Sequence, residues 1–159
     1  MTAPPRFLAD AMLGRLARWL RVLGFDAEYD ATHPDPLLVR RAADEGRILL
    51  TRDRHLLREL RPARALEVRA DAPLAQLAEV VAAHGLTPPA EPFTRCLVCN
   101  AELSPPLAEE EAARLVPPAS RGLPGAVRVC PRCGRTYWPG SHVRRMRDAL
   151  ARALPGWEE

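Results

Sequence analysis

The sequence predicts an α/β domain with a mostly parallel sheet, followed by a small cysteine-containing domain. Short apolar runs alternate with segments of helical periodicity in the first half, a proline-rich stretch follows at residues 86–92, and all four cysteines lie after that stretch. Strands that alternate with helices favour a parallel sheet, because each helix returns the chain to the same edge. Since three prolines in seven residues end any helix or central strand, we place a domain boundary near residue 90, between residues 1–90 and residues 91–159.

Each element of the first domain follows from a local pattern. We expect strands where short runs are largely apolar, at residues 6–9, 25–29, 47–51 and 65–69. The run RILLT at 47–51 is the clearest and is typical of a strand buried on both faces. Apolar residues at helical spacing predict helices at residues 12–23, 36–45, 54–60 and 73–84. Glycines stop three of them, at Gly24, Gly46 and Gly85. In the second domain we expect a short helix at 109–115 and a C-terminal helix.

The composition excludes a disordered chain and a membrane-spanning one. Of the 159 residues, 47% are hydrophobic and 27% are charged, and the longest apolar runs are too short to cross a bilayer. The opening segment, Met1–Arg6, lacks the apolar core of a signal peptide, so we expect a cytoplasmic protein without a membrane partner. The net charge of +3 is too small to indicate a nucleic-acid partner by itself. The sequence leaves a homodimer or a protein partner open.

Four aspartates lie at the start of predicted helices: Asp10, Asp35, Asp53 and Asp71. All except Asp35 also follow a predicted strand, and the carboxyl ends of parallel strands share one edge, where α/β folds bind ligands. Carboxylates that meet there repel one another unless a cation joins them, and Mg²⁺ or Mn²⁺ prefers such oxygen ligands. Ions of this kind activate water for the hydrolysis of phosphodiesters.

A purely structural interpretation competes with this one. Aspartate before a helix is a preferred N-cap that contributes about 0.5–2 kcal/mol, so each of the four could act as a cap alone. Their recurrence at strand ends favours a joint metal site, and one carboxylate can cap with one oxygen and bind a metal with the other. Both interpretations stay open at this point.

Arginines near the aspartates are candidates for phosphate contacts. Arg15, Arg18 and Arg21 lie on the polar side of the first predicted helix, and Arg52 directly precedes Asp53. Guanidinium groups bind phosphate oxygens, which suits the backbone of a nucleic acid beside an acidic site. All 23 basic residues of the chain are arginine, however, so an ordinary solvated helix face is the alternative.

The cysteines form two C-x-x-C pairs, Cys96/Cys99 and Cys130/Cys133, with 30 residues between them. Each pair directs two thiolates at one ion, so together they suit tetrahedral Zn²⁺ in a closed structural site. A redox dithiol, which needs only one pair, and an iron–sulfur cluster are the alternatives. Because a short domain has little core, we expect zinc to supply much of its folding energy. Metal removal should then unfold residues 91–159 and leave residues 1–90 folded.

Aromatic and basic residues follow the second cysteine pair. Tyr137 and Trp138 could stack on bases, with phosphates held by nearby arginines: Arg144, Arg145 and Arg147. Equally, Trp138 could pack the small domain against the first one. His142 is a further candidate for a phosphate or metal contact.

Five motifs are spread in order over most of the chain: FLADAMLGRLARWLRVLGFDAEYD (residues 7–30), the helix that opens at Asp35, EGRILLTRDRHLL (45–57), TRCLVCNAEL (94–103) and CPRCGRTYWPGSH (130–142). Together they resemble the Mut-seven C-terminal RNase family. The resemblance implies a PIN-like fold with a metal-dependent ribonuclease site, followed by a zinc ribbon. It implies acidic site residues at Asp10, Asp35 and Asp53, with Asp71 as a weaker fourth match. PIN nucleases often carry a glutamate within a helix where this chain offers Asp35, Asp44 or Glu45, so the second ligand stays open.

The residues and the resemblance together predict a ribonuclease that uses Mg²⁺ or Mn²⁺ at Asp10, Asp35 and Asp53, with Asp71 as a fourth catalytic residue. The candidate RNA-binding residues are Arg15, Arg18, Arg52, Trp138, His142 and Arg145. One alternative is a non-catalytic RNA-binding module, which would bind RNA in a salt-sensitive way without turnover. The other is a protein adaptor, which would co-purify with a partner and lack affinity for RNA.

Overall fold

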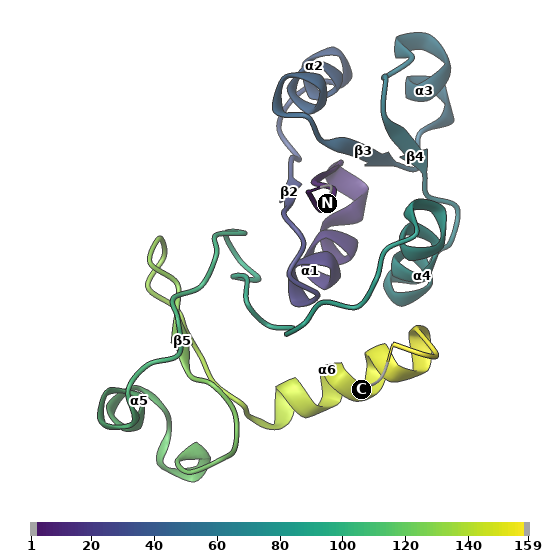
Figure 1. The fold of residues 1–159 in the computed structure, drawn as a ribbon. Helices are drawn as coiled ribbons and strands as arrows, with labels where there is room; N and C mark the ends of the chain where they lie inside the picture. The colour runs from purple at the N-terminus through teal and green to yellow at the C-terminus, as the bar shows by residue number, and fades with distance from the viewer. Residues whose placement is uncertain (1–2, 158–159) are drawn as a thin grey trace.

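The computed structural model describes residues 3–157; Met1, Thr2, Glu158 and Glu159 lie outside this range, so the opening segment is described only in part. The first ninety residues contain the alternating strands and helices that the sequence predicts (Figure 1). In chain order the elements are β1 (Phe7–Ala9), the 3-10 helix η1 (Ala11–Leu13), α1 (Gly14–Val22), β2 (Ala27–Tyr29), α2 (Asp35–Glu45), β3 (Ile48–Thr51), α3 (Arg54–Leu60), β4 (Ala65–Glu67) and α4 (Pro73–His84).

The four strands form one parallel sheet in the order β2-β1-β3-β4. In its register, Leu8 of β1 lies between Glu28 of β2 and Leu49 of β3. The chain passes from β1 to β2 on one side and then returns across β1 to form β3, so the direction of winding reverses between β1 and β3. Such a reversal opens a crevice at the carboxyl ends of the two strands, where open α/β sheets bind ligands. The predicted fold class is confirmed.

Helices cover both faces of the sheet and make a three-layer domain. One core joins the sheet to α1 and α4, and it contains Phe7, Leu16, Leu20, Leu50, Leu77 and Val80. The other core joins the sheet to α2 and α3, and it contains Leu8, Leu38, Ala42, Leu49 and Leu56. Adjacent strand residues enter opposite cores because successive side chains point to opposite faces. This explains why β1 and β3, which are buried throughout, are almost continuously apolar instead of alternating.

The remaining elements are short apart from the last helix, which returns to the first domain. They are α5 (Glu109–Leu115), the 3-10 helix η2 (Pro118–Ser120), β5 (Arg128–Val129), β6 (Thr136–Tyr137) and α6 (Ser141–Ala153). The short strands β5 and β6 pair antiparallel. Helix α6 runs beside α4 (Figure 1), and Leu154 directly after it is buried in the core of α1 and α4.

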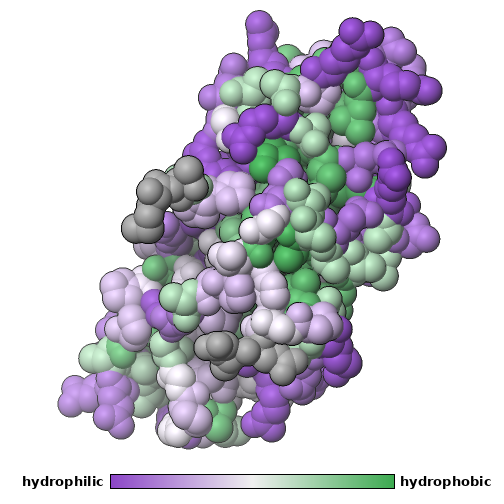
Figure 2. Space-filling view, turned by 45° about the vertical axis from the view of Figure 1, so that its right-hand side comes forward, coloured by the Kyte–Doolittle hydropathy of each residue, from purple (hydrophilic) through white to green (hydrophobic). Residues whose placement is uncertain are grey.

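On the face drawn in Figure 2, hydrophilic residues line much of the rim and hydrophobic residues gather toward the middle. Within residues 3–157, none of the helices has the length and apolar content needed to span a membrane.

Some boundaries differ from the predicted ones. β2 begins at Ala27 because the N–H of Phe25 donates to the carbonyl of Leu20 (3.0 Å) in the turn that ends α1. β4 ends at Glu67, so Asp71 lies in the loop beyond it and caps no helix. Asp35 is the first residue of α2 and makes no side-chain cap.

The cysteine-containing segment docks onto the turn between α1 and β2, and Arg21 carries this contact. Its buried guanidinium donates from Nε to the carbonyl of Ala27 (2.8 Å) and from Nη1 to the carbonyls of Leu97 (2.9 Å) and Val98 (3.3 Å). Beside it, Oδ1 of Asn100 accepts from the N–H of Ala27 (3.0 Å). The expectation that Arg21 faces solvent as a phosphate contact is therefore wrong.

We expect Arg21→Met to lower the free energy of unfolding by about 1–3 kcal/mol, because buried carbonyl groups would lose their hydrogen-bond donor. Arg18→Met is the matched control, since Arg18 is exposed on the same helix and its loss should change stability by no more than about 0.5 kcal/mol. Denaturant unfolding measures both. Equal effects of the two substitutions would contradict the docking role of Arg21.

Candidate functional site

Asp10 lies at the carboxyl edge of the sheet, at the point where the winding of the sheet reverses. It directly follows β1, and its own N–H donates to the carbonyl of Leu50 in β3 (3.2 Å). Its carboxylate accepts from the hydroxyl of Thr51 at Oδ2 (2.5 Å) and from the N–H of Met12 at Oδ1 (3.1 Å). Asp10 is therefore both the cap of η1 and a side chain bound to the end of β3.

Thr51 also links Asp10 to Asp53. The Thr51 side chain is fully buried, and its Oγ1 accepts from the N–H of Asp53 (3.0 Å) while it donates to Asp10. Asp53 is exposed and caps α3, since Oδ1 accepts from the N–H groups of His55 (2.9 Å) and Leu56 (3.1 Å). Asp53 can therefore act both as a helix cap and as a metal ligand, because its Oδ2 takes no part in the cap.

Asp10, Asp35 and Asp53 carry negative charge at this edge of the sheet. Burial raises the pKa of Asp10, the hydrogen bonds from Thr51 and Met12 oppose that rise, and the charges of Asp35 and Asp53 add to it. Among residues 3–157, no ion pair involves any of these three aspartates. Oxygen donors with unbalanced charge fit a hard divalent cation.

The three carboxylates are less tightly gathered than the cysteines. In the described part of the chain, the four cysteines are the one group of three or more His, Cys, Asp or Glu side chains whose ligand atoms all lie within 4.8 Å. Asp71 differs from the other three aspartates because it forms an ion pair. Its exposed carboxylate pairs with Nη2 of Arg52 (2.8 Å), and Nη1 of Arg52 donates to the carbonyl of Ala70 (2.6 Å). The structure therefore joins Asp71 to Arg52 at the same edge of the sheet.

Sequence reasoning missed Asp30, although it directly follows β2 just as Asp10 follows β1. Asp30 is buried, and its N–H donates to the carbonyl of Ala9 (3.0 Å). Its carboxylate accepts from the backbone of Thr32 (3.0 Å), from Nη1 of Arg41 (3.0 Å), and from both the backbone (3.0 Å) and Nδ1 (2.6 Å) of His33. Burial raises the pKa of Asp30, but these donors outweigh it and hold the pKa well below the ordinary value. Asp30 fixes the loop that leads to Asp35.

The candidate RNA contacts fall into two places. Arg15 and Arg18 are exposed on α1. Arg145 and His142 are exposed on α6, where the ring of His142 meets half-buried Trp138 edge-on at 5.9 Å between centroids. Tyr137, in contrast, uses its hydroxyl to contact Sγ of Cys96 (3.1 Å) and to accept from the N–H of Leu97 (3.0 Å), so it supports the cysteine site and is no free stacking surface.

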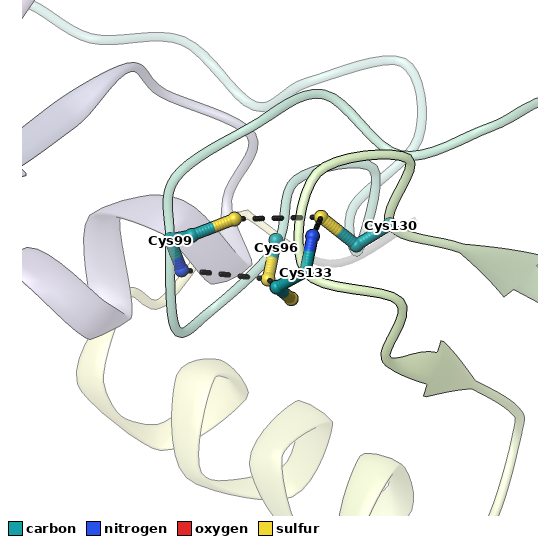
Figure 3. Close-up of side chains that lie close together, drawn as sticks. All are labelled: Cys96, Cys99, Cys130 and Cys133. Carbon is teal, nitrogen blue, oxygen red and sulfur yellow. Dashed lines mark hydrogen bonds between the residues drawn. The ribbon is translucent and has the colours of Figure 1, made fainter.

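The four cysteines point toward one another from two turns of similar shape (Figure 3). Sγ of Cys99 lies 3.4 Å from Sγ of Cys130, and Sγ of Cys96 lies 3.7 Å from Sγ of Cys133. Backbone N–H groups contact the sulfurs within each pair. Each turn closes on a residue with positive φ, Asn100 at 70° and Gly134 at 79°. The geometry can hold one metal ion.

Crowding separates the acidities of these thiols. Burial opposes ionisation of Cys96, but hydrogen bonds from the Tyr137 hydroxyl and the Cys99 amide lower the pKa of its thiol. Burial and the neighbouring thiols raise the pKa of Cys99. All four can ionise together only if a cation balances their charge, which is the condition that a metal site meets.

The fold and these residues define a class: a three-layer α/β protein with acidic residues at the carboxyl edge of its sheet and a separate group of four cysteines that can hold a metal ion. The family model described as Mut7-C RNAse domain matches residues 5–150, and the chain belongs to that family. This confirms the resemblance found in the sequence. The family suggests a nuclease and implies RNA as its substrate. No curated protein and no solved structure matches the chain.

We expect Asp30→Asn to lower the free energy of unfolding at neutral pH by about 1.5–3 kcal/mol, because several donors lose a charged acceptor. The pKa of Asp30 is lowered on folding, so its stabilisation is complete above the unfolded value of 3.8 and is lost as the pH falls toward the folded value. The gap between wild type and variant should therefore narrow in acid. Denaturant unfolding at several pH values tests this, with exposed Asp44→Asn on α2 as the control. A gap that stays constant below pH 3.8 would contradict the charge-based account.

Proposed function

We propose that the chain is a divalent-metal-dependent ribonuclease of PIN-like type, which hydrolyses phosphodiester bonds of RNA at the carboxyl edge of its sheet. The observation that carries the proposal is the position of Asp10 at the reversal point, with Asp35 and Asp53 raising its pKa and no basic partner among the described residues. Phosphate is an anion, so an uncompensated acidic crevice suits its cleavage only if a cation is bound there.

Asp10, Asp35 and Asp53 are the residues that would hold Mg²⁺ or Mn²⁺. Such a cation lowers the pKa of water and balances the charge of the phosphodiester. The protein supplies the orientation: Thr51 holds Oδ2 of Asp10, and the cap of α3 fixes Asp53. Arg15 and Arg18 attract the RNA backbone from α1. Asp71 contributes as a fourth acidic residue of the same edge, placed by Arg52.

The four cysteines are proposed to bind structural Zn²⁺, which would make residues 91–159 a zinc-ribbon domain next to a nuclease domain of residues 1–90. In this part, Trp138, His142 and Arg145 are the proposed contacts to RNA. Arg21 contacts the ribbon at Leu97, and Asn100 of the ribbon contacts Ala27. These contacts give the ribbon a second role, since they connect its metal-binding turn to the start of β2.

The acidic crevice favours an enzyme over the two alternative functions. A protein that only binds RNA gains nothing from carboxylates close to phosphates, because like charges repel. A protein adaptor has no need for Asp10 to remain at an unbalanced edge, where burial and repulsion both raise its pKa. An enzyme that binds a cation uses this arrangement directly.

Cleavage of RNA tests the proposal. We expect wild-type protein with Mn²⁺ or Mg²⁺ to cleave labelled RNA, and Asp10→Asn/Asp53→Asn to lose more than about 100-fold of this activity, since even outer contacts of metal ligands are worth 10–100-fold. Glu110→Gln/Glu111→Gln removes the same two negative charges from the exposed surface of α5 and should retain activity. Equal cleavage by wild type and the double variant would locate the activity elsewhere.

Metal removal tests the coupling between the ribbon and the nuclease domain. The docking contacts of Arg21 modify the expectation from the sequence: a chelator should unfold the ribbon and also weaken the turn between α1 and β2, because the carbonyls of Leu97 and Val98 would no longer hold Arg21. Hydrogen exchange followed by mass spectrometry should show faster exchange in residues 18–30. Unchanged exchange in that segment, with the ribbon unfolded, would show that the two parts are independent.

A further inference from the structure

A cavity lies where the linker, the ribbon and α6 meet. It has a volume of about 250 Å³, and its lining includes Phe93, Leu97, Trp138, His142 and Arg147. Apolar and aromatic side chains with a few polar groups at the edge are the usual composition of a ligand site. The volume suits one flat ring system better than a large ligand.

Two aromatic side chains of the cavity are arranged beside cationic or polar groups. The guanidinium carbon of Arg147 lies 5.3 Å from the centre of the Phe93 ring, and the ring of Trp138 meets that of His142 edge-on. Gly140 makes the second contact feasible, because a Cβ there would lie 3.1 Å from both Trp138 Nε1 and His142 Nδ1. Both Phe93 and Trp138 are half-buried, so part of each ring stays accessible.

The backbone at Phe93 is strained. Its φ is 63°, a conformation that residues with a side chain rarely adopt, and its N–H donates to the carbonyl of Val22 (2.9 Å). Strain of this kind persists where surrounding contacts impose it, and it is concentrated at ligand sites. The side chain of Phe93 lines the cavity.

The charge around the cavity favours a polyanion. Arg144, Arg145 and Arg147 are exposed on the first turns of α6, where Asp148 is the one acidic residue of the helix. The acidic residue at the rim, Glu91, is already paired with Nη2 of Arg128 (2.9 Å). Aromatic rings beside arginines are the combination that binds single-stranded nucleic acid, since bases stack on the rings and phosphates pair with the guanidinium groups.

The cavity lies away from the acidic crevice. Leu97, which lines the cavity, belongs to the turn that docks at the amino end of β2, whereas Asp10 follows the carboxyl end of β1. The sheet, about 10 Å long for strands of three residues, separates the two edges. One nucleotide cannot reach both places.

We infer that this cavity receives one unpaired nucleobase of an RNA strand whose phosphates lie along the arginines of α6, at a distance from the cleavage site. The inference rests on the proposed function for the identity of the nucleic acid, and it extends that function to a substrate long enough to occupy both edges of the domain. The base stacks on Trp138, and Arg147, whose guanidinium lies over the ring of Phe93, contacts the adjoining phosphate.

Binding to the non-cleaving Asp10→Asn chain tests the inference. The probes are a labelled single-stranded RNA of roughly 20 nucleotides, longer than a single binding site, and an abasic strand of the same length, which keeps the phosphates and lacks the bases. We expect the Asp10→Asn chain to bind the base-containing strand about 10-fold more tightly than the abasic one. Adding Trp138→Ala should remove that difference. Trp138→Phe should preserve most of it, because a stacking surface remains.

Leu115→Ala on α5 is the control, since it removes an exposed apolar side chain from the same part of the chain. Metal content and circular dichroism confirm folding, and Trp138→Phe keeps the test valid if Trp138→Ala does not fold. An equal affinity for both strands in the parent chain, or a base preference that survives in Trp138→Ala, would overturn the inference. Cleavage is measured separately on the wild type. A base preference of the Asp10→Asn chain, together with no cleavage by the wild type, would reject the proposed function and retain the nucleobase site.

Discussion

The complete burial of β1 and β3 is the constraint on which the rest of the structure depends. Phe7, Leu8, Leu49 and Leu50 have no solvent exposure, and they divide between the two cores. A strand buried on both faces tolerates a polar side chain only when that side chain is hydrogen-bonded. Thr51 is the polar residue at the end of β3, and the carboxylate of Asp10 is its acceptor. The packing of the sheet therefore fixes the position of the central residue of the acidic crevice.

Asp26 at the amino edge of the sheet and Asp10 at the carboxyl edge have pKa values shifted in opposite directions. At the amino edge, Asp26 pairs with Nη1 of Arg47 (2.6 Å) and also accepts from Nδ2 of Asn100 (2.7 Å). These contacts balance burial and lower the pKa of Asp26. At the carboxyl edge, burial and like charges raise the pKa of Asp10. Asp30 and Asp71 at the carboxyl edge are paired with arginines, whereas no ion pair within residues 3–157 involves Asp10. The fold therefore pairs several of its aspartates with arginines and leaves Asp10 without a basic partner in that range.

Local patterns were sufficient to predict the order of elements, the cysteine group and the position of Asp10 at the end of the first strand. Helix periodicity and glycine stops are encoded within ten or so residues, and the α3 and α4 bounds match the prediction. The role of Arg21 could not be predicted in this way, because its acceptors Leu97 and Val98 lie 76 and 77 residues away. Asp30 could have been found by the rule that located Asp10, since it too follows a strand, but its many donors come from the loop and from Arg41. A pattern shows which residues reach an edge, whereas only the packed structure shows which of them are already neutralised.

The short strands connect these two edges mechanically. β1 and β2 have three residues each, so the turn held by Arg21 and Asn100 and the loop held by Asp30 lie at the two ends of one short strand, β2. A buried sheet transmits displacement because interiors are close-packed and have few voids. Ordering of the cysteine turns at the amino edge therefore restricts the position of β2, and through the contact of Asp30 with Ala9 it restricts the end of β1 where Asp10 begins. The cysteine turns and Asp10 are thus connected through β2, although they lie at opposite edges of the sheet.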